Sequence, residues 1–499
     1  MRRIISEDEL KRELIEIVGF ENVLDDEKTL KSFASDFSFI TGKSPILIVK
    51  PRNVYQVLQI IRLANEKKVP LIPTSSKMPR FRGDTIPTRD KSVIVDLSGM
   101  KKIIRMDRRN RVAIIEPGVT FEELQEAAAK QGLKVLMPLI PRATKSVLGS
   151  YLEREPILIP RYHWDMTDPL LCTEVVFGTG DIFRTGSAAG PGTLEEQWAS
   201  GQAQKNPMGP AQTDLVRVIQ GSQGTMGIVT WASVKLELLP KLERLFFAQA
   251  QRLEELLDLV YRLMCLRMGD ECFILNNTNL ACILGNNSDR ILEIREKVSP
   301  WILFICVTGL ERLPEERLKY QTDDIFKSAQ EFNIELVPEI PVINGEQMLK
   351  IFSKSSEEPY WKLRLRGGCA ELFFLTTLDK TPEMVETVYE VAESLNYPKT
   401  DLGVYIQPIQ QGRNCHCEFN IPYDPNDEKN FENSQRLFLQ ACERLIERGG
   451  FFSRPYPDLS NIVYSKTDDN VVGTLRRLKE LFDPNGVMNP GKLCFWEVD

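Results

Sequence analysis

Three glycines fall within seven residues of the segment 221–230, directly before an apolar run that is typical of a buried strand. Glycine has no Cβ, so it allows backbone conformations and close approaches that other residues block. The segment therefore predicts main chain that lies against something flat or charged. A tight turn without a ligand is the alternative that these residues alone leave open.

Strands and helices alternate on the N-terminal side of this segment. Strands are expected at 46–49, 69–73, 92–97 and 112–115. Asn53 begins a helix whose apolar residues recur at i, i+3, i+4 and i+7, and Thr120 with Glu123 forms a capping box that opens a second helix. This alternation places the first half in the α/β or α+β class.

The second half has a different order of elements. Its pattern predicts helices at 253–268 and 381–395, a long charged helix that reaches about residue 333, and strands at 272–276, 280–284, 301–309, 370–377, 402–407 and 415–421. We expect an antiparallel sheet with helices on one side, in a roughly ferredoxin-like arrangement. Pro240 is the expected hinge between the halves.

Length and composition exclude several classes of protein. A chain of 499 residues exceeds one ordinary core, and no apolar run approaches the roughly 20 residues of a membrane span. The net charge of −7 argues against nucleic acid as a partner. An early acidic N-terminus and ten scattered cysteines favour a cytoplasmic protein with free thiols. Only two histidines, His163 and His416, are present, so we predict no metal site.

The loop 73–83 follows a βαβ strand, where backbone amides can converge on a phosphate. It keeps one glycine, Gly83, and has Ser75 and Ser76 near its start. Its basic side chains, at positions 77, 80 and 82, could attract a diphosphate directly. A solvated basic loop is the alternative.

The C-terminal stretch 483–492, Asp-Pro-Asn-Gly-Val-Met-Asn-Pro-Gly-Lys, completes a set of motifs with the segments 73–83, 116–119, 144–150, 174–181 and 221–230. In their order and spacing these motifs resemble the FAD-linked oxidase superfamily, in the branch of vanillyl-alcohol oxidase and 4-cresol dehydrogenase. The similarity covers most of residues 30–240 and about 450–492.

This resemblance implies an α+β fold with two domains. A two-part PCMH-type FAD-binding domain would comprise residues 1–240 and a returning segment 450–499, and a ferredoxin-like α+β cap that binds substrate would be inserted at 241–449. No histidine occupies the places at which some relatives attach FAD covalently, so noncovalent FAD is expected.

The resemblance also implies which residues contact FAD. They are Thr74, Ser75, Ser76, Lys77, Arg80, Arg82, Gly83, Pro117, Gly118, Thr144, Ser146, Val147, Gly149, Ser150, Gly221, Ser222, Gly224, Thr225, Gly227, Ile228, Val229, Asn489 and Lys492. Asn489 can offer a donor and an acceptor to a ring edge, whereas the ammonium of Lys492 is expected to be solvated.

Four residues are predicted to be catalytic. Asp165 falls where the vanillyl-alcohol oxidase branch has an acidic residue beside the flavin, and it could accept a substrate proton or stabilise developing positive charge. Arg454 matches the arginine of an adjacent tyrosine–arginine pair in that branch, but Ser453 replaces the tyrosine, which puts a phenolic substrate in doubt. Tyr456 could supply a hydroxyl, and His416 is expected to line the cavity. The alternatives are a turn or capping residue for Asp165 and a surface ion pair for Arg454.

The expected activity is oxidation of a small alcohol or hydroxy acid by hydride transfer to flavin N5. The reduced flavin then passes electrons to oxygen or to a redox protein, of which an iron–sulfur subunit is one kind. A D-2-hydroxyacid dehydrogenase of the lactate or glycolate type is the first alternative. A flavin-binding subunit with an electron-relay or structural role is the second, because the loop 73–83 is poor in glycine. A homo-oligomer is expected.

Overall fold

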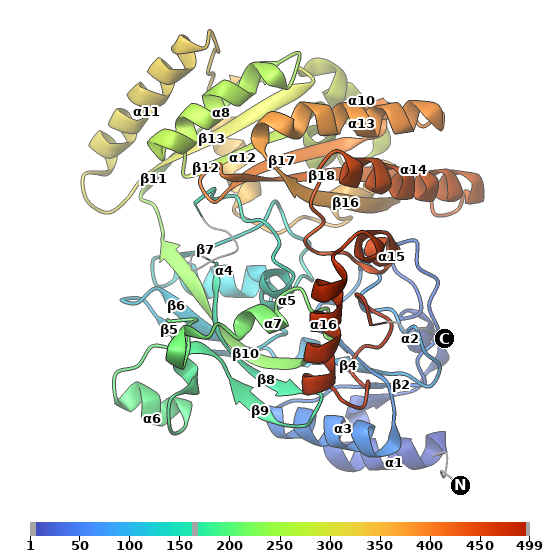
Figure 1. Ribbon diagram of the computed structural model, residues 1–499. Helices are drawn as coiled ribbons and strands as arrows, with labels where there is room; N and C mark the ends of the chain where they lie inside the picture. Colours follow the sequence, from blue (N-terminus) through green and yellow to red (C-terminus); the bar gives the residue numbers. More distant parts are fainter. Residues whose placement is uncertain (1–5, 162–167, 496–499) are drawn as a thin grey trace.

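The computed structural model describes residues 6–161 and 168–495. The chain forms two tiers (Figure 1): the lower contains the first half and the C-terminal helices, and the upper is built on one large sheet. The sheet changes between β10, which ends at Leu238, and β11, which begins at Leu242. The domain boundaries at 240 and 450 stay a prediction.

The first sheet of the lower tier has the strand order β1-β2-β4-β3, in which β4 pairs in parallel with both β2 and β3. Its strands are β1 (Val23–Leu24), β2 (Leu47–Val49), β3 (Leu71–Thr74) and β4 (Val93–Asp96). Its helices are α1 (Glu7–Val18), α2 (Glu27–Lys31) and α3 (Val54–Lys67). The side chain of Asn53 caps α3, as predicted, and α3 buries Val57, Ile60 and Ile61 against the sheet.

The second sheet of the lower tier is antiparallel, with the order β5-β6-β10-β8-β9 and β7 paired to β10. Its strands are β5 (Ile103–Asp107), β6 (Val112–Ile115), β7 (Leu133–Val135), β8 (Leu170–Phe177), β9 (Ile182–Arg184) and β10 (Gly227–Leu238). Its helices are α4 (Phe121–Ala129), α5 (Val147–Leu152), α6 (Leu194–Ala199) and α7 (Val216–Ile219). The capping box of Thr120 and Glu123 at the start of α4 is confirmed.

The C-terminal segment returns to the first sheet after the helices α15 (Pro457–Ser465) and α16 (Asp469–Phe482). Met488 pairs in parallel with Leu71 of β3. The amide of Leu71 donates to Val487 O at 2.8 Å, and the amide of Asn489 donates to Leu71 O at the same distance. Residues more than 400 positions apart in the sequence therefore complete one sheet edge.

The upper tier is a six-stranded antiparallel sheet with the order β11-β13-β12-β17-β18-β16. Its strands are β11 (Leu242–Ala250), β12 (Glu271–Asn276), β13 (Trp301–Gly309), β16 (Gly368–Thr376), β17 (Gly403–Ile409) and β18 (Asn414–Tyr423). Two short strands, β14 (Glu339–Ile340) and β15 (Ile343–Asn344), form a separate hairpin. We call this tier the cap.

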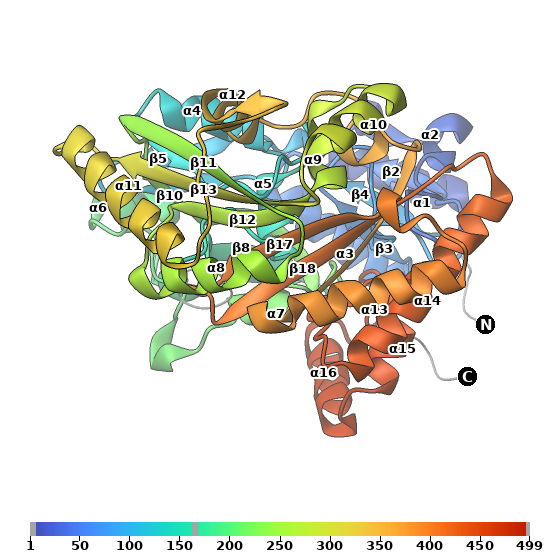
Figure 2. The same cartoon turned by 90° about the horizontal axis from the view of Figure 1, so that it is seen from above.

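Helices cover both faces of the cap sheet, which differs from the expected one-sided arrangement. The outer face packs on α8 (Glu254–Leu266), α11 (Pro314–Glu331), α13 (Thr381–Ser394) and α14 (Glu428–Glu447). Figure 2 shows α8, α13 and α14 lying along the strands. The inner face packs on α9 (Asn277–Leu284), α10 (Ser288–Lys297) and α12 (Gly345–Phe352), together with Phe81, Leu139 and Leu158 of the lower tier.

The strand predicted at 280–284 is wrong, because these residues lie in α9. Asn276 ends β12, and its side chain accepts a hydrogen bond from the amide of Asn279, which caps the helix. The short apolar run that suggested a strand is the buried side of α9. A short apolar run fits a strand or a helix equally well, and here the N-cap residue Asn276 favours the helix.

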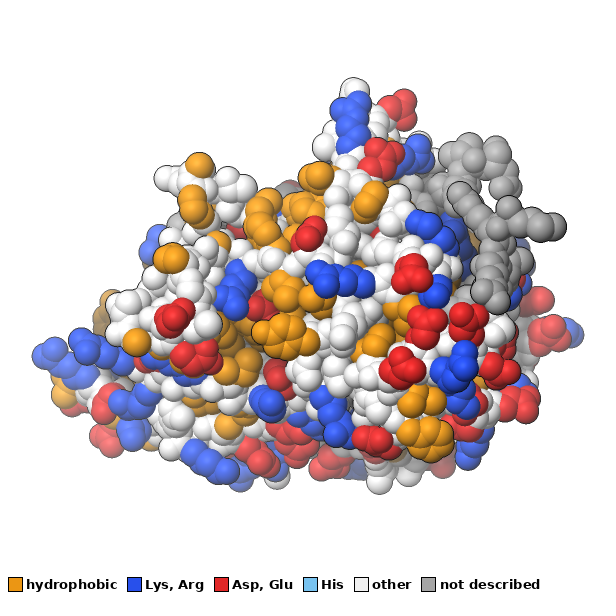
Figure 3. Space-filling model, turned by 90° about the horizontal axis from the view of Figure 1, so that it is seen from below, with side chains coloured by type: hydrophobic (Ala, Val, Ile, Leu, Met, Phe, Trp, Pro, Cys, Tyr) orange, Lys and Arg blue, Asp and Glu red, His pale blue; other side chains and the backbone are white. Residues whose placement is uncertain are grey.

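The α+β class is confirmed by these sheets and helices. The ten cysteines, all within the described residues, are free thiols. Among the helices that the structure describes, none combines the length and the apolar character needed to cross a bilayer. On the face seen from below, basic and acidic side chains are interspersed and do not form one large patch of either sign (Figure 3).

Candidate functional site

A deep cavity lies where the inner face of the cap meets the lower tier. Its empty space amounts to about 1560 Å³, counted out to its opening. Both tiers contribute residues to the lining of this cavity.

Thirteen residues predicted to bind FAD lie in the lower wall of the cavity. Those that line the cavity are Thr74, Ser75, Ser76, Arg80, Arg82, Pro117, Gly149, Gly221, Ser222, Gly224, Gly227, Ile228 and Val229. Those that lie outside the lining are Lys77, Gly83, Gly118, Thr144, Ser146, Val147, Ser150, Thr225, Asn489 and Lys492. The structure brings the separate motifs to one wall, and their contacts with a cofactor stay a prediction.

The glycine segment 221–230 is held against β3 by close packing. Gly224 has φ +73°, and a Cβ on it would lie 2.5 Å from Pro73 Cγ. Lys479 of α16 fixes the same segment from behind, since its buried ammonium donates to Thr225 O at 2.6 Å and to Met488 O at 2.8 Å. A Cβ on Gly221 would meet no atom within 4 Å, and Gly221 lines the cavity, so its backbone has no side chain between it and the cavity.

Replacing Gly224 by alanine should lower the free energy of unfolding by about 1–3 kcal/mol, because the added methyl would collide with Pro73 at a strained φ. Gly473 in α16 is the matched control. Its Cβ would meet nothing within 4 Å, so Gly473→Ala should stabilise the protein by roughly 0.5–1 kcal/mol. Urea unfolding of both variants measures the two effects, and equal shifts of the same sign would contradict the role of Gly224.

The loop 73–83 and the segment 144–150 are joined by polar contacts. The amide of Ser146 donates to Ser76 Oγ at 3.0 Å, and Thr144 Oγ1 donates to Met78 O at 3.1 Å. A Cβ on Gly149 would lie 3.0 Å from Ser75 Oγ. The two segments thus form one continuous wall, while the exposed Lys77 side chain lies outside it.

Asn489 and Lys492 support this wall from behind. The side-chain amide of Asn489 donates to Asp84 O at 2.8 Å and to Gln223 O at 2.6 Å. The ammonium of Lys492 is fully buried and donates to Gly83 O at 2.7 Å and to Ile86 O at 2.8 Å. The expectation of a solvated Lys492 is therefore wrong: the stretch 489–492 fixes the backbone of the loop 73–83.

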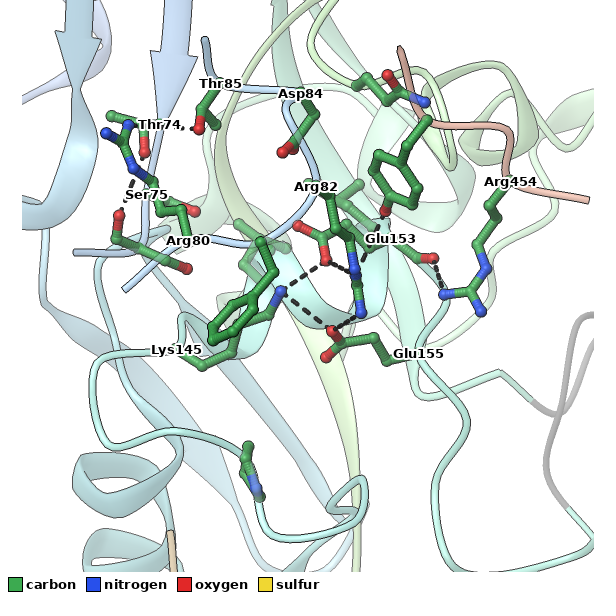
Figure 4. A pocket seen from close by; sticks show the side chains of 18 of the residues that line it. Thr74, Ser75, Arg80, Arg82, Asp84, Thr85, Lys145, Glu153, Glu155 and Arg454 are labelled. Atoms are coloured by element: carbon green, nitrogen blue, oxygen red, sulfur yellow. Dashed lines mark hydrogen bonds and ion pairs between the residues drawn. The ribbon is translucent and has the colours of Figure 1, made fainter. Parts of the chain in front are cut away.

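A network of buried ion pairs lies in the wall of the cavity (Figure 4). Arg82 pairs with Glu153, with Glu155 at 2.8 Å and, across to the cap, with Glu371 at 3.1 Å. Lys145 pairs with Glu153 at 2.6 Å and with Glu155 at 3.2 Å. Arg82 is thus neutralised by protein carboxylates.

The network continues along the inner face of the cap sheet. Lys362 pairs with Glu371 at 2.7 Å and with Glu418 at 2.5 Å, and Glu418 Oε2 lies 3.2 Å from Nε2 of His416. Side chains alternate between the two faces of a strand, so His416 and Glu418 of β18 share one face. Tyr405, which is the register partner of Glu418 on β17, lines the cavity beside it.

The charges of this network are fixed by their neighbours. Burial alone would raise the pKa of Glu418, but Lys362 and the hydrogen bond with His416 hold that pKa well below its usual range. Lys362 and Arg82 likewise lower the pKa of Glu371 against the effect of burial. Burial lowers the pKa of His416, so its imidazole is neutral. Glu418 is therefore an ionised carboxylate beside one cation and one neutral imidazole.

The residues predicted to be catalytic occupy different places. Arg454 and Tyr456 line the cavity: Arg454 lies over the ring of Phe373 at 4.2 Å and donates to Glu153 O at 2.9 Å. Tyr456 is buried, and its hydroxyl lies 3.4 Å from Nη1 of Arg82. His416 lies behind the wall and reaches the cavity through Glu418. Asp165 falls outside the described residues.

Sequence reasoning missed the charged residues of the network. They are Lys145, Glu153, Glu155, Lys362, Glu371 and Glu418. Glu371 and Glu418 each interrupt a strand that is otherwise mostly apolar and buried. Because a buried carboxylate is costly unless it is paired, such an interruption was the signal that could have revealed them.

The wall also contains buried polar atoms without partners. Oε1 of Gln223 and Nε of Arg142 have no hydrogen-bond partner among the described residues, although both side chains line the cavity. Buried polar atoms in folded proteins nearly always have a hydrogen-bond partner. A buried polar atom without one therefore points to a ligand or water as its partner. Together with the bare backbone of Gly221, these atoms fit a bound cofactor rich in polar groups.

Comparison with known proteins shows the family to which the chain is related. The family described as FAD binding domain matches residues 45–186, and that described as FAD linked oxidases, C-terminal domain, matches residues 376–493. A glycolate oxidase subunit of Bacillus subtilis is 22% identical over 97% of this chain and 96% of its own. The 4-cresol dehydrogenase flavoprotein subunit of Pseudomonas putida is 23% identical over 95% and 93%. The crystal structure of p-cresol methylhydroxylase with substrate bound superposes with a TM-score of 0.82 at 17% identity, covering 98% of this chain and 96% of that one.

Proposed function

Because the chain belongs to the FAD-linked oxidases, we propose that it oxidises a small alcohol or hydroxy acid at carbon, by hydride transfer to flavin N5. When bound, FAD supplies the two-electron acceptor, and the protein supplies orientation, charge placement and exclusion of water. One observation carries the proposal: thirteen of the residues predicted to bind FAD and the carboxylate of Glu418 on the cap line the same cavity.

Such an oxidation releases a proton that the protein must accept. The C–H bond breaks with its electron pair leaving as hydride, the O–H bond gives up its proton, and a carbonyl product remains. Glu153, Glu155 and Glu371 each pair with two cations. Glu418 pairs with one cation, Lys362, and its second oxygen holds the neutral His416. Glu418 is therefore the proposed first acceptor of this proton; because Lys362 holds its pKa low, it is a weak base and must pass the proton on to water.

His416 is proposed to position Glu418. In the tautomer that donates from Nε2, the ring fixes one carboxylate oxygen, and the other remains with Lys362. Nδ1 of His416 is buried without a partner among the residues that the structure describes. The ring also packs on Phe373 at 5.9 Å and on Tyr405 at 5.7 Å between ring centres, and its hydrogen bond goes to Glu418.

Arg454 is proposed to orient the substrate. Its guanidinium is buried in the cavity wall and is held over Phe373, so it can present donors without moving. A guanidinium in such a place favours an oxygen anion or a carboxylate on the substrate. Tyr456 adds a neutral hydroxyl beside it, because burial keeps the pKa of this phenol above its usual value.

Anaerobic reduction of the bound flavin tests the activity. The purified protein should show the absorption bands of oxidised flavin, and these should bleach on addition of a substrate from a panel of small aliphatic alcohols, benzylic alcohols and 2-hydroxy acids. Absence of flavin bands in protein purified and reconstituted with FAD would contradict the proposal. Bound flavin that no member of the panel reduces would favour the electron-relay role.

A D-2-hydroxyacid dehydrogenase is the second candidate, favoured by the similarity to a glycolate oxidase subunit over 97% of the chain. The same panel separates the two. Faster bleaching by the D-enantiomer of a 2-hydroxy acid than by any alcohol without a carboxylate would select this candidate, because Arg454 would then bind the carboxylate.

A protein is proposed as the final electron acceptor, by analogy with the relative from Pseudomonas putida, which is described as a flavoprotein subunit. If oxygen were the acceptor, each substrate consumed in air would yield one hydrogen peroxide. We expect little peroxide and rapid turnover with an artificial electron carrier. Stoichiometric peroxide would instead identify an oxidase.

A further inference from the structure

The cations on the lower wall of the cavity differ in how far they are neutralised. Arg82 is surrounded by three carboxylates, and Lys145 by two. The glycine-poor loop 73–83 therefore cannot rely on Arg82 to compensate for amide contacts with a diphosphate. If charge replaces glycine in this site, it must come from other residues.

Two arginines on the same wall have no such carboxylates. Within residues 6–161 and 168–495, neither Arg80 nor Arg142 has a carboxylate oxygen within 4.0 Å. Arg80 lies over the ring of Phe33 at 4.3 Å and already donates to Ser32 O at 2.8 Å, to Thr85 Oγ1 at 3.3 Å and to Met78 Sδ at 3.1 Å, so it contributes mainly its charge. Nε of Arg142 is buried without a partner.

The positive charges of Arg80 and Arg142 also interact with each other. Burial lowers the pKa of Arg80, and the positive charge of Arg142 lowers it further, against the opposing effect of Asp36 and Asp84. Arg80 and Arg142 repel each other across the wall, while the nearby charges of Asp36 and Asp84 attract Arg80. An anion bound between the two arginines offsets that repulsion.

The backbone around Arg142 is fixed on both sides. The amide of Lys145 donates to Arg142 O at 3.0 Å, and the amide of Ser356 of the cap donates to Pro141 O at 2.7 Å. The guanidinium of Arg142 lies 5.4 Å from the ring centre of Phe81. Arg142 is thus positioned before any ligand arrives, next to the wall formed by Ser75, Ser76 and Gly149.

We infer that Arg142, assisted by Arg80, binds the diphosphate of FAD in place of the glycine amides that the loop 73–83 lacks. A guanidinium can donate two parallel hydrogen bonds to phosphate oxygens, which gives geometry as well as charge. The inference rests on FAD as the cofactor and is independent of the substrate. It also explains how a loop with one glycine still serves a dinucleotide.

Flavin binding to the full-length protein freed of its cofactor tests this role. Arg142→Met should raise the Kd of FAD by about 10- to 100-fold, the range expected for loss of a charge-assisted hydrogen bond. The Kd of riboflavin, which has no phosphate, should stay within about twofold. Both are read from the quenching of flavin fluorescence, without any substrate.

Two further variants complete the test. Arg142→Lys keeps a point charge but loses the paired donors, so its Kd for FAD should fall between those of the wild type and Arg142→Met. Arg105→Met is the matched control, because Arg105 stacks on Trp198 at 4.9 Å and lies outside the cavity lining. An unchanged Kd for FAD in Arg142→Met, or equal weakening of FAD and riboflavin, would overturn the inference. Equal weakening of both would show that Arg142 only supports the fold of the wall.

Discussion

Replacing Glu418 by glutamine should slow reduction of the bound flavin by substrate by about 10²-fold, the lower end of the contribution of a general base, because the lowered pKa of Glu418 makes it a weak base. Glutamine keeps the size of the side chain and its contact with Lys362, but its amide cannot accept the proton that the substrate hydroxyl releases. The rate is measured by stopped-flow bleaching under anaerobic conditions. Flavin content should be unchanged, because Glu418 lies on the cap side of the cavity.

The matched control for this variant is Glu443→Gln. Glu443 is exposed on α14, on the outer side of the cap sheet, and the same chemical change there should leave the rate unaltered. A rate for Glu418→Gln within about threefold of the wild type would remove Glu418 from the mechanism. Asp165, which matches in the sequence the position of an acidic residue in the resembled branch, would then be the remaining candidate for the base.

Replacing Arg82 by methionine should lower the free energy of unfolding by about 3–5 kcal/mol, because three buried carboxylates each lose one of their two cationic partners. The carboxylate of Glu371 belongs to the cap, whereas Glu153 and Glu155 belong to the lower tier. Loss of Arg82 should therefore also loosen the contact between the tiers. Urea unfolding followed by two probes, one in each tier, measures both effects.

An exposed ion pair provides the comparison for Arg82. Arg252 pairs with Glu255 at 3.1 Å on the surface, and Arg252→Met should cost less than about 1 kcal/mol. Adding Glu371→Gln to Arg82→Met should restore part of the lost stability, since one of the three carboxylates is removed. A loss below about 1 kcal/mol for Arg82→Met would show that water reaches the network.

Local patterns in the sequence were sufficient to predict most of the fold. The helix begun by Asn53, the capping box of Thr120 and Glu123 and the strand at 112–115 depend on neighbouring residues, and the structure has all three. The prediction of a strand at 280–284 was wrong because a short apolar run has no periodicity that separates a strand from a helix. The N-cap residue Asn276, which begins the helix, was overlooked.

The site was predictable only in part, for a physical reason. Glycines and serines of the cofactor wall act through their own backbone, so their motifs are visible in the sequence. The ion network joins residues that are remote from one another: Arg82 and Glu371 lie 289 positions apart. No local pattern indicates which buried carboxylate meets which cation, and the basic residues 77, 80 and 82 looked alike before the fold separated them.

The pairing of Met488 with Leu71 sets an order for biosynthesis. At roughly 5–20 residues per second, the ribosome needs on the order of 20 to 80 s to make the chain between these two residues. During that interval β3 is an open sheet edge, and the cap sheet, whose strands are all made earlier than residue 488, can form first. Until residue 488 is made, β3 therefore presents an unpaired edge to other chains, and the C-terminal segment covers that edge last.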